Sequence, residues 1–261
     1  MNLFYETHGS GAPLVLIPGF ASGAWTWYRQ IEELARNFRV VVFDPRGIGR
    51  SLSGGGKDEL RGLSMETFVE DVLRILDELK IRRAHVLGAS FGGFVAQEFA
   101  LRFPERLEKL ILACTTSGGA RHVRPTEEIL RSFAPDPRLP MGEKIRKFFR
   151  PAFTAAFHRD FPGEVEKVCL LRERHEVAET AYLAQLEAAF SFNTEARVAE
   201  IRHETLVLTG DCDLIVPMEN SVNLAARLPR ATLEIIENGS HMFFIENYRE
   251  FNQSVLNFLQ S

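Results

Sequence analysis

The chain has 261 residues, of which 45% are hydrophobic and 25% charged, and its formal net charge at pH 7 is −4. Such a chain can form one sizeable globular domain with an insertion, and its charge gives no reason to expect nucleic acid or an anionic membrane as a partner. It has no apolar stretch of membrane-spanning length, and its first residues predict no secretory signal.

Short apolar runs alternate with amphipathic helical patterns along most of the chain. The runs are predicted to be fully buried strands, at Leu14–Ile17, Val40–Phe43, Ala84–Leu87, Leu110–Ala113, Leu206–Thr209 and Leu233–Ile236. Helices are predicted at Met65–Leu79, at Phe91–Phe103 and along an apolar stripe from Tyr248 to Leu259. This alternation predicts a mostly parallel sheet that is covered by helices on both faces.

The alternation stops between about Thr115 and Ile201. That stretch has no convincing strand, and it contains helical patterns at Thr126–Phe133, Gly142–Phe157 and Glu164–Phe190. We therefore predict a core formed by residues 1–116 and 201–261, with an inserted all-helical cap at residues 117–200. In the first core segment, the tract Ser51–Lys57 is predicted to be a flexible loop.

The motif Gly88-Ala89-Ser90-Phe91-Gly92 directly follows one predicted strand and opens a predicted helix. A sharp strand-to-helix turn lifts a serine hydroxyl clear of the sheet, and small flanking residues let the backbone fold that tightly. The N-terminus of the helix supplies free N–H groups and a positive dipole, which favour a developing oxyanion. In this context the motif predicts that Ser90 is a nucleophile.

A serine nucleophile needs a base, and a histidine base needs a third group that holds its tautomer. His241 lies just past the strand Leu233–Ile236 and is the predicted base. The other histidines are predicted to be structural or solvated; they are His8, His85, His122, His158, His175 and His203.

The acid is expected after a further strand, where Gly210-Asp211-Cys212-Asp213 offers two carboxylates. The chain needs a few residues after Gly210 to turn a side chain back toward His241. Asp213 is therefore the predicted acid, and Asp211 is predicted to be solvated or to cap the turn. Ser90, Asp213 and His241 all follow the carboxyl ends of predicted parallel strands, where open α/β sheets place their sites.

The oxyanion of an acyl-transfer reaction needs backbone donors. One predicted donor is the N–H of Phe91, directly after the nucleophile, and the other is the N–H of Phe20, in the loop after Leu14–Ile17. Together with the phenylalanines of the cap, Phe20, Ile215 and Met242 are predicted to form an apolar substrate pocket of limited size.

These motifs resemble those of the α/β-hydrolase superfamily, and more narrowly of its cofactor-free members with a helical cap. The resemblance covers nearly the whole chain, and the matching segments are Leu14–Phe20, Asp44–Ser51, Gly88–Gly92, Gly210–Asp213 with Val216-Pro217, and Gly239–His241. It implies the α/β-hydrolase fold with an inserted cap, a small-molecule substrate, and no cofactor or metal. The family pattern also places the acid three residues after the loop glycine, which points to Asp213.

The chain departs from the family pattern at Pro18-Gly19, where relatives usually have His-Gly. The resemblance implies that this histidine helps to brace the oxyanion loop. The donor expected from that loop is a backbone N–H, which Pro18 does not remove.

The expected function is hydrolysis of a small to medium apolar carboxylic ester through an acyl-enzyme on Ser90. Enol-lactone hydrolysis, carbon–carbon bond hydrolysis and haloperoxidase-like perhydrolysis are the alternatives within the family, and a catalytically silent binding member is the alternative outside catalysis. Dehalogenases and epoxide hydrolases of the fold need a carboxylate in place of Ser90. A dinucleotide-binding enzyme is disfavoured because Gly47-Ile48-Gly49 lacks a third glycine.

Three widely spaced cysteines, Cys114, Cys169 and Cys212, form no metal-ligand cluster in the sequence. Free thiols in a reducing compartment are the simplest interpretation, and they predict a cytoplasmic location. The sequence leaves the physiological substrate and the oligomeric state open.

Overall fold

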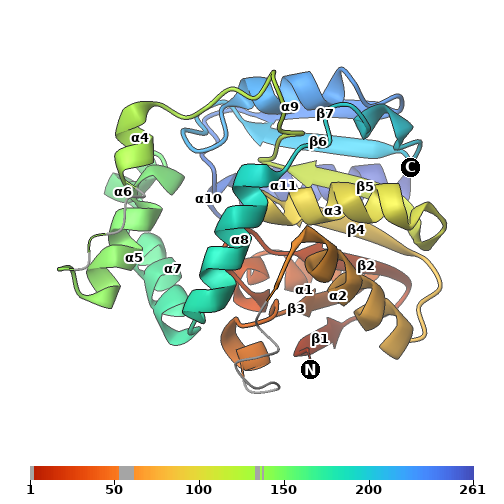
Figure 1. Ribbon diagram of the computed structural model, residues 1–261, viewed down its shortest axis with the longest axis horizontal. Helices are drawn as coiled ribbons and strands as arrows, with labels where there is room; N and C mark the ends of the chain where they lie inside the picture. The colour runs from red at the N-terminus through yellow and green to blue at the C-terminus, as the bar shows by residue number, and fades with distance from the viewer. Residues whose placement is uncertain (1–2, 53–61, 133–135, 137) are drawn as a thin grey trace.

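The computed structural model describes residues 3–52, 62–132, 136 and 138–261, and a seven-stranded sheet lies at its centre (Figure 1). The strand order is β1-β3-β2-β4-β5-β6-β7. The strands are β1 (Tyr5–His8), β2 (Ala12–Ile17), β3 (Phe38–Phe43), β4 (Ala84–Ala89), β5 (Leu107–Ala113), β6 (Thr205–Gly210) and β7 (Ala231–Ile236). β1 pairs antiparallel with β3, and the other neighbouring pairs are parallel, so the predicted mostly parallel sheet is confirmed.

Alternate side chains of the strands enter two apolar cores, one on each face of the sheet. Leu14 and Val40 belong to the core that includes Phe251 of the C-terminal helix, and Val15 and Val41 belong to the core that includes Val72. The helices that flank the sheet are α1 (Ile31–Leu34), α2 (Met65–Glu78), α3 (Phe91–Arg102), α9 (Met218–Ala225), α10 (Phe243–Glu246) and α11 (Tyr248–Gln260).

One strand was not predicted, and one prediction about a strand is corrected. The short antiparallel strand β1 has no apolar run, and the sequence pattern did not indicate it. β7 is an edge strand that pairs only with β6, and Ile235 is 47% exposed, so the prediction that this strand is fully buried is wrong. Both strands lie at the edges of the sheet, where one side of the strand has no neighbour.

Helices α4 to α8 lie between β5 and β6 in the chain and form the predicted helical insertion (Figure 1). They are α4 (Glu127–Ser132), α5 (Met141–Phe149), α6 (Ala155–Asp160), α7 (Pro162–Arg174) and α8 (Glu179–Ser191). The pattern at 142–157 is two helices, separated by a 3₁₀ turn that contains Pro151. The pattern at 164–190 is also two helices, because Val177 lies between them and pairs with Ile48 of the core.

The insertion leaves and rejoins the core at a narrow neck. Gly118 forms an isolated antiparallel bridge with Asn193, and the N–H of Thr194 donates to the carbonyl of Ser117 over 2.8 Å. The fully buried hydroxyl of Thr194 also donates to Oε1 of Gln97, on α3, over 2.7 Å. The end of the insertion is therefore fixed to the helix that begins at Ser90.

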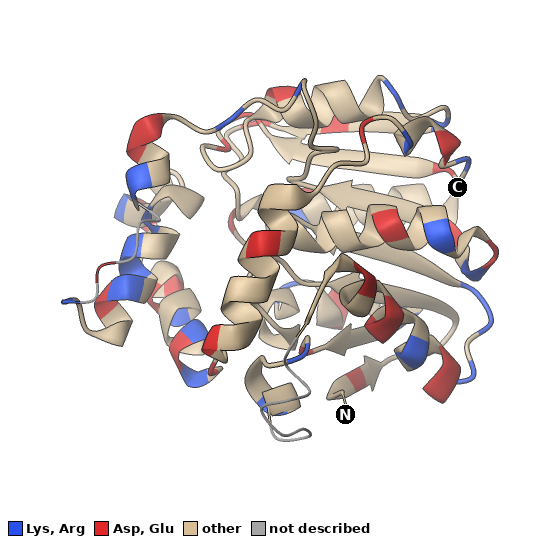
Figure 2. Ribbon diagram, in the orientation of Figure 1, with Lys and Arg blue, Asp and Glu red and all other residues tan. Residues whose placement is uncertain are grey.

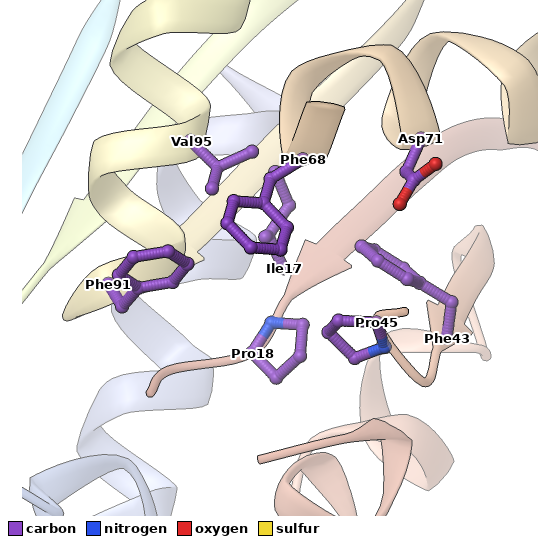
Figure 3. Close-up of a pocket in the computed structure, with 8 residues that line it drawn as sticks. All are labelled: Ile17, Pro18, Phe43, Pro45, Phe68, Asp71, Phe91 and Val95. Carbon is purple, nitrogen blue, oxygen red and sulfur yellow. The ribbon is translucent and has the colours of Figure 1, made fainter. Parts of the chain in front are cut away.

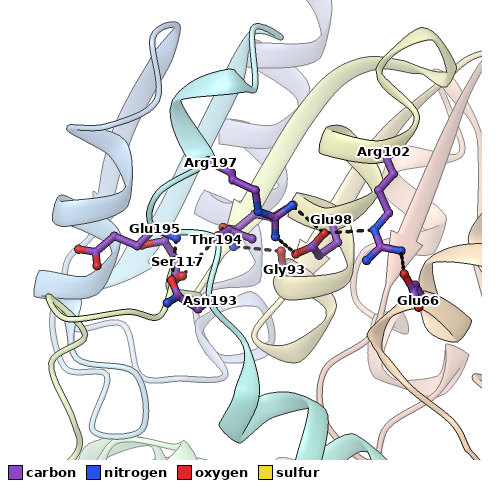
Figure 4. Close-up of polar contacts among 10 residues, drawn as sticks. Glu66, Gly93, Glu98, Arg102, Ser117, Asn193, Thr194, Glu195 and Arg197 are labelled. Carbon is purple, nitrogen blue, oxygen red and sulfur yellow. Dashed lines mark hydrogen bonds and ion pairs between the residues drawn. The ribbon is translucent and has the colours of Figure 1, made fainter.

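A charged network continues from this neck across α3 to α2 (Figure 4). The carboxylate of Glu98, only 7% exposed, binds Arg197 on one side and Nε of Arg102 on the other at 3.3 Å. Arg102 also donates to Glu66 of α2 over 2.8 Å. Because two guanidinium groups contact it, the charge of the buried carboxylate of Glu98 is compensated.

Lysines and arginines alternate with acidic residues on the insertion and on the outer helices (Figure 2). None of the helices in the described part of the chain is long and apolar enough to cross a membrane. Of the tract predicted as a flexible loop, Ser51 and Leu52 belong to a 3₁₀ helix, and its other residues lie outside the described part of the chain.

Because His85 on β4 is buried, we expect the folded protein to lose stability in mild acid. Its side chain is 7% exposed and packs edge-on against Phe38, and burial lowers the pKa of its imidazole. In the unfolded chain, the imidazole of His85 binds a proton near pH 6.5, whereas in the folded protein it binds one only at lower pH. The free energy of unfolding therefore falls as the pH drops below about 6.5, by up to about 1.4 kcal/mol per pH unit. In urea unfolding at pH 7.5 and 5.5, His85→Leu should lose less stability than the wild type. An equal loss in both proteins would contradict the prediction.

Candidate active site

Ser90 lies at the sharp turn between β4 and α3. Its backbone has φ +54° and ψ −118°, a strained conformation for a residue with a side chain, and its N–H donates to the carbonyl of Ala113 over 2.8 Å. Gly88 and Gly92 make the turn possible: a Cβ on Gly88 would lie 2.2 Å from the carbonyl oxygen of Gly92. The structure thus places Ser90, half-buried, at the tight strand-to-helix turn that the motif predicts.

Asp213 and His241 are joined by a hydrogen bond. Nδ1 of His241 lies 2.8 Å from Oδ2 of Asp213, and the two residues are 7% and 5% exposed. The other carboxylate oxygen, Oδ1, accepts the backbone N–H groups of Ile215 and Val216, each at 2.8 Å. Three donors therefore fix the carboxylate of Asp213, and the imidazole is fixed through it with Nε2 left for another partner.

Asp211 and Asp213 differ in burial and in their contact with His241. It is exposed, whereas Asp213 is buried and bonded to His241. The turn begins at Gly210, where a Cβ would lie 2.0 Å from the carbonyl oxygen of Gly239. This close approach brings the loop after β6 against the loop after β7, and it carries Asp213 toward His241.

The three predicted residues follow strands that end at the same edge of the sheet. Ala89 of β4 pairs with Ala113 of β5, which pairs with Leu208 of β6, and Gly210 of β6 pairs with Ile236 of β7. Ser90 follows β4, Asp213 follows β6 and His241 follows β7. This carboxyl edge is where side chains from separate parallel strands can converge on one substrate.

The loop after β2 lies against Ser90. A Cβ on Gly19 would lie 3.5 Å from the Cβ of Ser90, and the ring of Phe20 packs edge-on against Phe91 with centroids 6.5 Å apart. Phe91 is the first residue of α3, so its N–H belongs to the free N-terminal turn of that helix. Both predicted oxyanion donors therefore belong to segments that flank Ser90.

A small cavity lies beside Pro18, between the ends of β2 and β3 and helices α2 and α3 (Figure 3). Its volume is about 10 Å³, room for about one water molecule. Its lining is mostly apolar and consists of Ile17, Pro18, Phe43, Pro45, Phe68, Asp71, Phe91 and Val95. This cavity is too small to hold a substrate.

The substrate pocket predicted at Ile215 and Met242 stays a prediction. Ile215 is half-buried against the apolar core that contains Met242, and the N–H of Met242 donates to the carbonyl of Ala152 in the insertion over 3.0 Å. A larger open groove of about 510 Å³ is lined by residues of α5, α6 and α7 and by Arg150 between them. Neither residue lines that groove, which lies within the insertion.

Helix α8 of the insertion contacts the oxyanion loop, a feature that the sequence analysis missed. The ring of Tyr182 stacks edge-on against Phe20 with centroids 4.8 Å apart. Oε1 of Gln185, a residue only 1% exposed, accepts the N–H of Ala21 over 2.8 Å. The sequence signal that could have indicated Gln185 is a polar residue on the face of α8 that is otherwise formed by the buried Ala181 and Ala188.

Cys114 also lies beside the site. It directly follows β5, has φ +41° and is fully buried. Burial, together with the negative charge of Asp213, raises the pKa of its thiol well above the usual range. The thiol therefore stays protonated and acts as a small packing group. Cys114, Cys169 and Cys212 are all free.

This chain is similar to known proteins in sequence and in fold. The family model described as "Alpha/beta hydrolase family" matches residues 14–254. A protein of Caulobacter segnis provisionally named carbamate hydrolase RutD is 31% identical, and the alignment covers 99% of this chain and 97% of that protein. A hydrolase from Pseudomonas aeruginosa is 28% identical with a TM-score of 0.83, over 99% of this chain and 94% of the other. A thermophilic esterase from Thermogutta terrifontis is 25% identical with a TM-score of 0.81, over 99% and 93%.

Proposed function

Because this chain belongs to the alpha/beta hydrolase family, we propose that it is a serine hydrolase that cleaves small to medium apolar carboxylic esters through an acyl-enzyme on Ser90. The observation that carries the proposal is the hydrogen bond between His241 and Asp213, at the sheet edge where Ser90 occupies its strained turn. An imidazole held at Nδ1 by a buried carboxylate presents Nε2 as a base, which is what a serine nucleophile requires.

In the proposed mechanism His241 accepts the hydroxyl proton of Ser90 while Oγ attacks the ester carbonyl. The N–H groups of Phe20 and Phe91 stabilise the oxyanion of the tetrahedral intermediate. His241 then gives its proton to the leaving alcohol, which leaves an acyl group on Ser90. Water gives a proton to His241 as it attacks this acyl-enzyme. His241 returns that proton to Oγ of Ser90 as the carboxylic acid leaves, which restores the free serine.

Carbamate hydrolysis is a second candidate, favoured by the name of the relative from Caulobacter segnis. The same machinery could cleave a carbamate, because the carbonyl again passes through an oxyanion. A matched pair of p-nitrophenyl acetate and p-nitrophenyl N-methylcarbamate separates the two, since both release the same chromophore. A higher kcat/KM for the ester supports our proposal, and a higher value for the carbamate would replace it.

We expect short acyl chains to be preferred over long ones. Three phenylalanines of the insertion, Phe149, Phe153 and Phe157, are at most 8% exposed. A fourth, Phe148, contacts Phe20 of the oxyanion loop with ring centroids 6.3 Å apart. An apolar pocket bounded in this way has limited room for an acyl chain. The value of kcat/KM for p-nitrophenyl esters should fall by about tenfold or more, about 1.4 kcal/mol in barrier height, between butanoyl and palmitoyl esters.

Detergent-free assays below the solubility limit of each ester keep micelles from distorting this comparison. The same series on the Ser90→Ala variant corrects for background hydrolysis. A clear preference for palmitoyl esters or for emulsified triglycerides would overturn the prediction.

A further inference from the structure

We propose that Gln185 is a positioning residue that holds the oxyanion loop in its working conformation from the helical insertion; this rests on the function proposed above. The observation is the 2.8 Å hydrogen bond from the N–H of Ala21 to Oε1 of Gln185, which joins residues 164 positions apart and is buried from solvent. Gln185 contacts Ala21, directly after Phe20, and its proposed effect on catalysis is exerted through the backbone of Phe20.

Ala21 lies in a turn whose backbone conformation is unfavourable for an alanine. The N–H of Ser22 donates to the carbonyl of Gly19 over 3.3 Å, so residues 19–22 form a β-turn. Of its two central residues, Phe20 and Ala21, only Ala21 has a positive φ, +51°, as in a type II turn. Glycine is the residue that this position favours, and left-handed backbone costs an alanine about 1–2 kcal/mol.

The peptide group between Phe20 and Ala21 is held at both ends. Its N–H donates to Gln185, and its carbonyl accepts the hydroxyl of Ser22 over 3.2 Å. Conversion to a type I turn, with φ of about −90° at Ala21, would turn this peptide group over and break both bonds. This flip changes ψ of Phe20 and φ of Ala21 and leaves φ of Phe20 at about −60°. The bond to Gln185 therefore holds the loop against α8, and it keeps in place Phe20, whose N–H is proposed to bind the oxyanion.

Helix α8 is a firm support because the core holds it at both ends. Before the helix, the N–H of Ala178 donates to the carbonyl of Gly47 over 2.8 Å, and after it Asn193 and Thr194 bind the neck at Gly118 and Ser117. Gln185 is therefore positioned relative to the sheet.

Packing alone does not account for a glutamine here. Nε2 of Gln185 is buried and has no hydrogen-bond partner among the described residues. A buried amide whose NH₂ group has no acceptor is unfavourable compared with an apolar side chain of the same size. An apolar residue of similar size should therefore preserve the fold and remove the hydrogen bond to Ala21.

Gln185→Met tests the proposal. We expect kcat for p-nitrophenyl butanoate to fall by about 10- to 100-fold, because a displaced oxyanion donor weakens transition-state binding, with KM changed less than about threefold. The thermal midpoint should stay near that of the wild type. Glu187→Ala, at an exposed position of the same helix, is the control and should keep wild-type activity. If Gln185→Met fails to fold, Gln185→Asn keeps the amide and withdraws the oxygen from Ala21.

A second substitution separates positioning of the loop from a direct contact with substrate. Ala21→Gly added to Gln185→Met should recover most of the lost kcat, because glycine adopts a positive φ without the steric cost. No recovery, an unchanged kcat in Gln185→Met, or a change confined to KM would overturn the proposal. A wild-type enzyme that hydrolyses no ester, and whose Ser90 reacts with no acylating probe, would instead overturn the proposed function.

Discussion

Ser90→Ala is expected to abolish labelling by a fluorophosphonate probe and to lower kcat for ester hydrolysis by about 10⁶, the loss seen when the serine of a comparable triad is removed. The hydroxyl oxygen of Ser90 forms the acyl bond. The nearby Cys114 thiol is not expected to replace it, because burial raises the pKa of that thiol and keeps it protonated. Gel fluorescence measures the labelling, and stopped assays with a chromogenic ester measure kcat.

The control is Ser254→Ala, at a half-buried serine on α11 that has no assigned role in catalysis, and this variant should keep full labelling and activity. The thermal midpoint of Ser90→Ala should stay close to that of the wild type, since the turn at residue 90 is set by its glycines. Full labelling of Ser90→Ala would show that the nucleophile lies elsewhere.

Asp213→Asn should lower kcat by up to about 10⁴, because an amide no longer holds the imidazole in the tautomer that leaves Nε2 free to accept a proton. The carboxylate of Asp213 accepts Nδ1 of His241 and the N–H groups of Ile215 and Val216. An asparagine can keep the two backbone bonds through its oxygen, so the fold should survive while the orientation of His241 changes. Steady-state kinetics with one chromogenic ester measures the loss.

Asp211→Asn is the matched control, with the same chemical change in the same loop. Asp211 is exposed, so its substitution should cost no more than about tenfold, or about 1.4 kcal/mol in barrier height. A larger loss for Asp211→Asn than for Asp213→Asn would transfer the role of the acid to Asp211. The pair formed by Ser90 and His241 would not be affected by that result.

The sequence predicted the parallel sheet well because the buried strands carry continuous apolar runs. It also predicted a tight turn at Ser90, since a G-x-S-x-G motif between a strand and a helix leaves few other conformations. Asp213 could be distinguished from Asp211 only by counting residues from Gly210, and the structure gives the physical difference between them, which is burial and a bond to His241.

What the sequence did not reveal are features decided by contacts between distant residues. Exposure of β7 depends on the order of strands, which no local pattern carries. The helical periodicity of residues 164–190 gave no sign of the break at Val177. The break is associated with a β-bridge between Val177 and Ile48, a residue distant in the sequence. The bond from Ala21 to Gln185 likewise joins two segments whose own patterns are satisfied without it.

The narrow neck at Gly118 and Asn193 bears on how such a protein can change over evolutionary time. The chain between these two residues departs from the core and returns to it at this one bridge. Strands β5 and β6 pair directly with each other, and Leu110 lies beside Thr205. The entropy of closing a long loop rises slowly, by about 0.6 kcal/mol for each doubling of its length. Helices of the insertion other than α8, which contacts the oxyanion loop, can therefore be lengthened, shortened or exchanged with little penalty to the sheet. Selection for a new substrate can then act on these helices while the catalytic edge and its support from α8 are inherited.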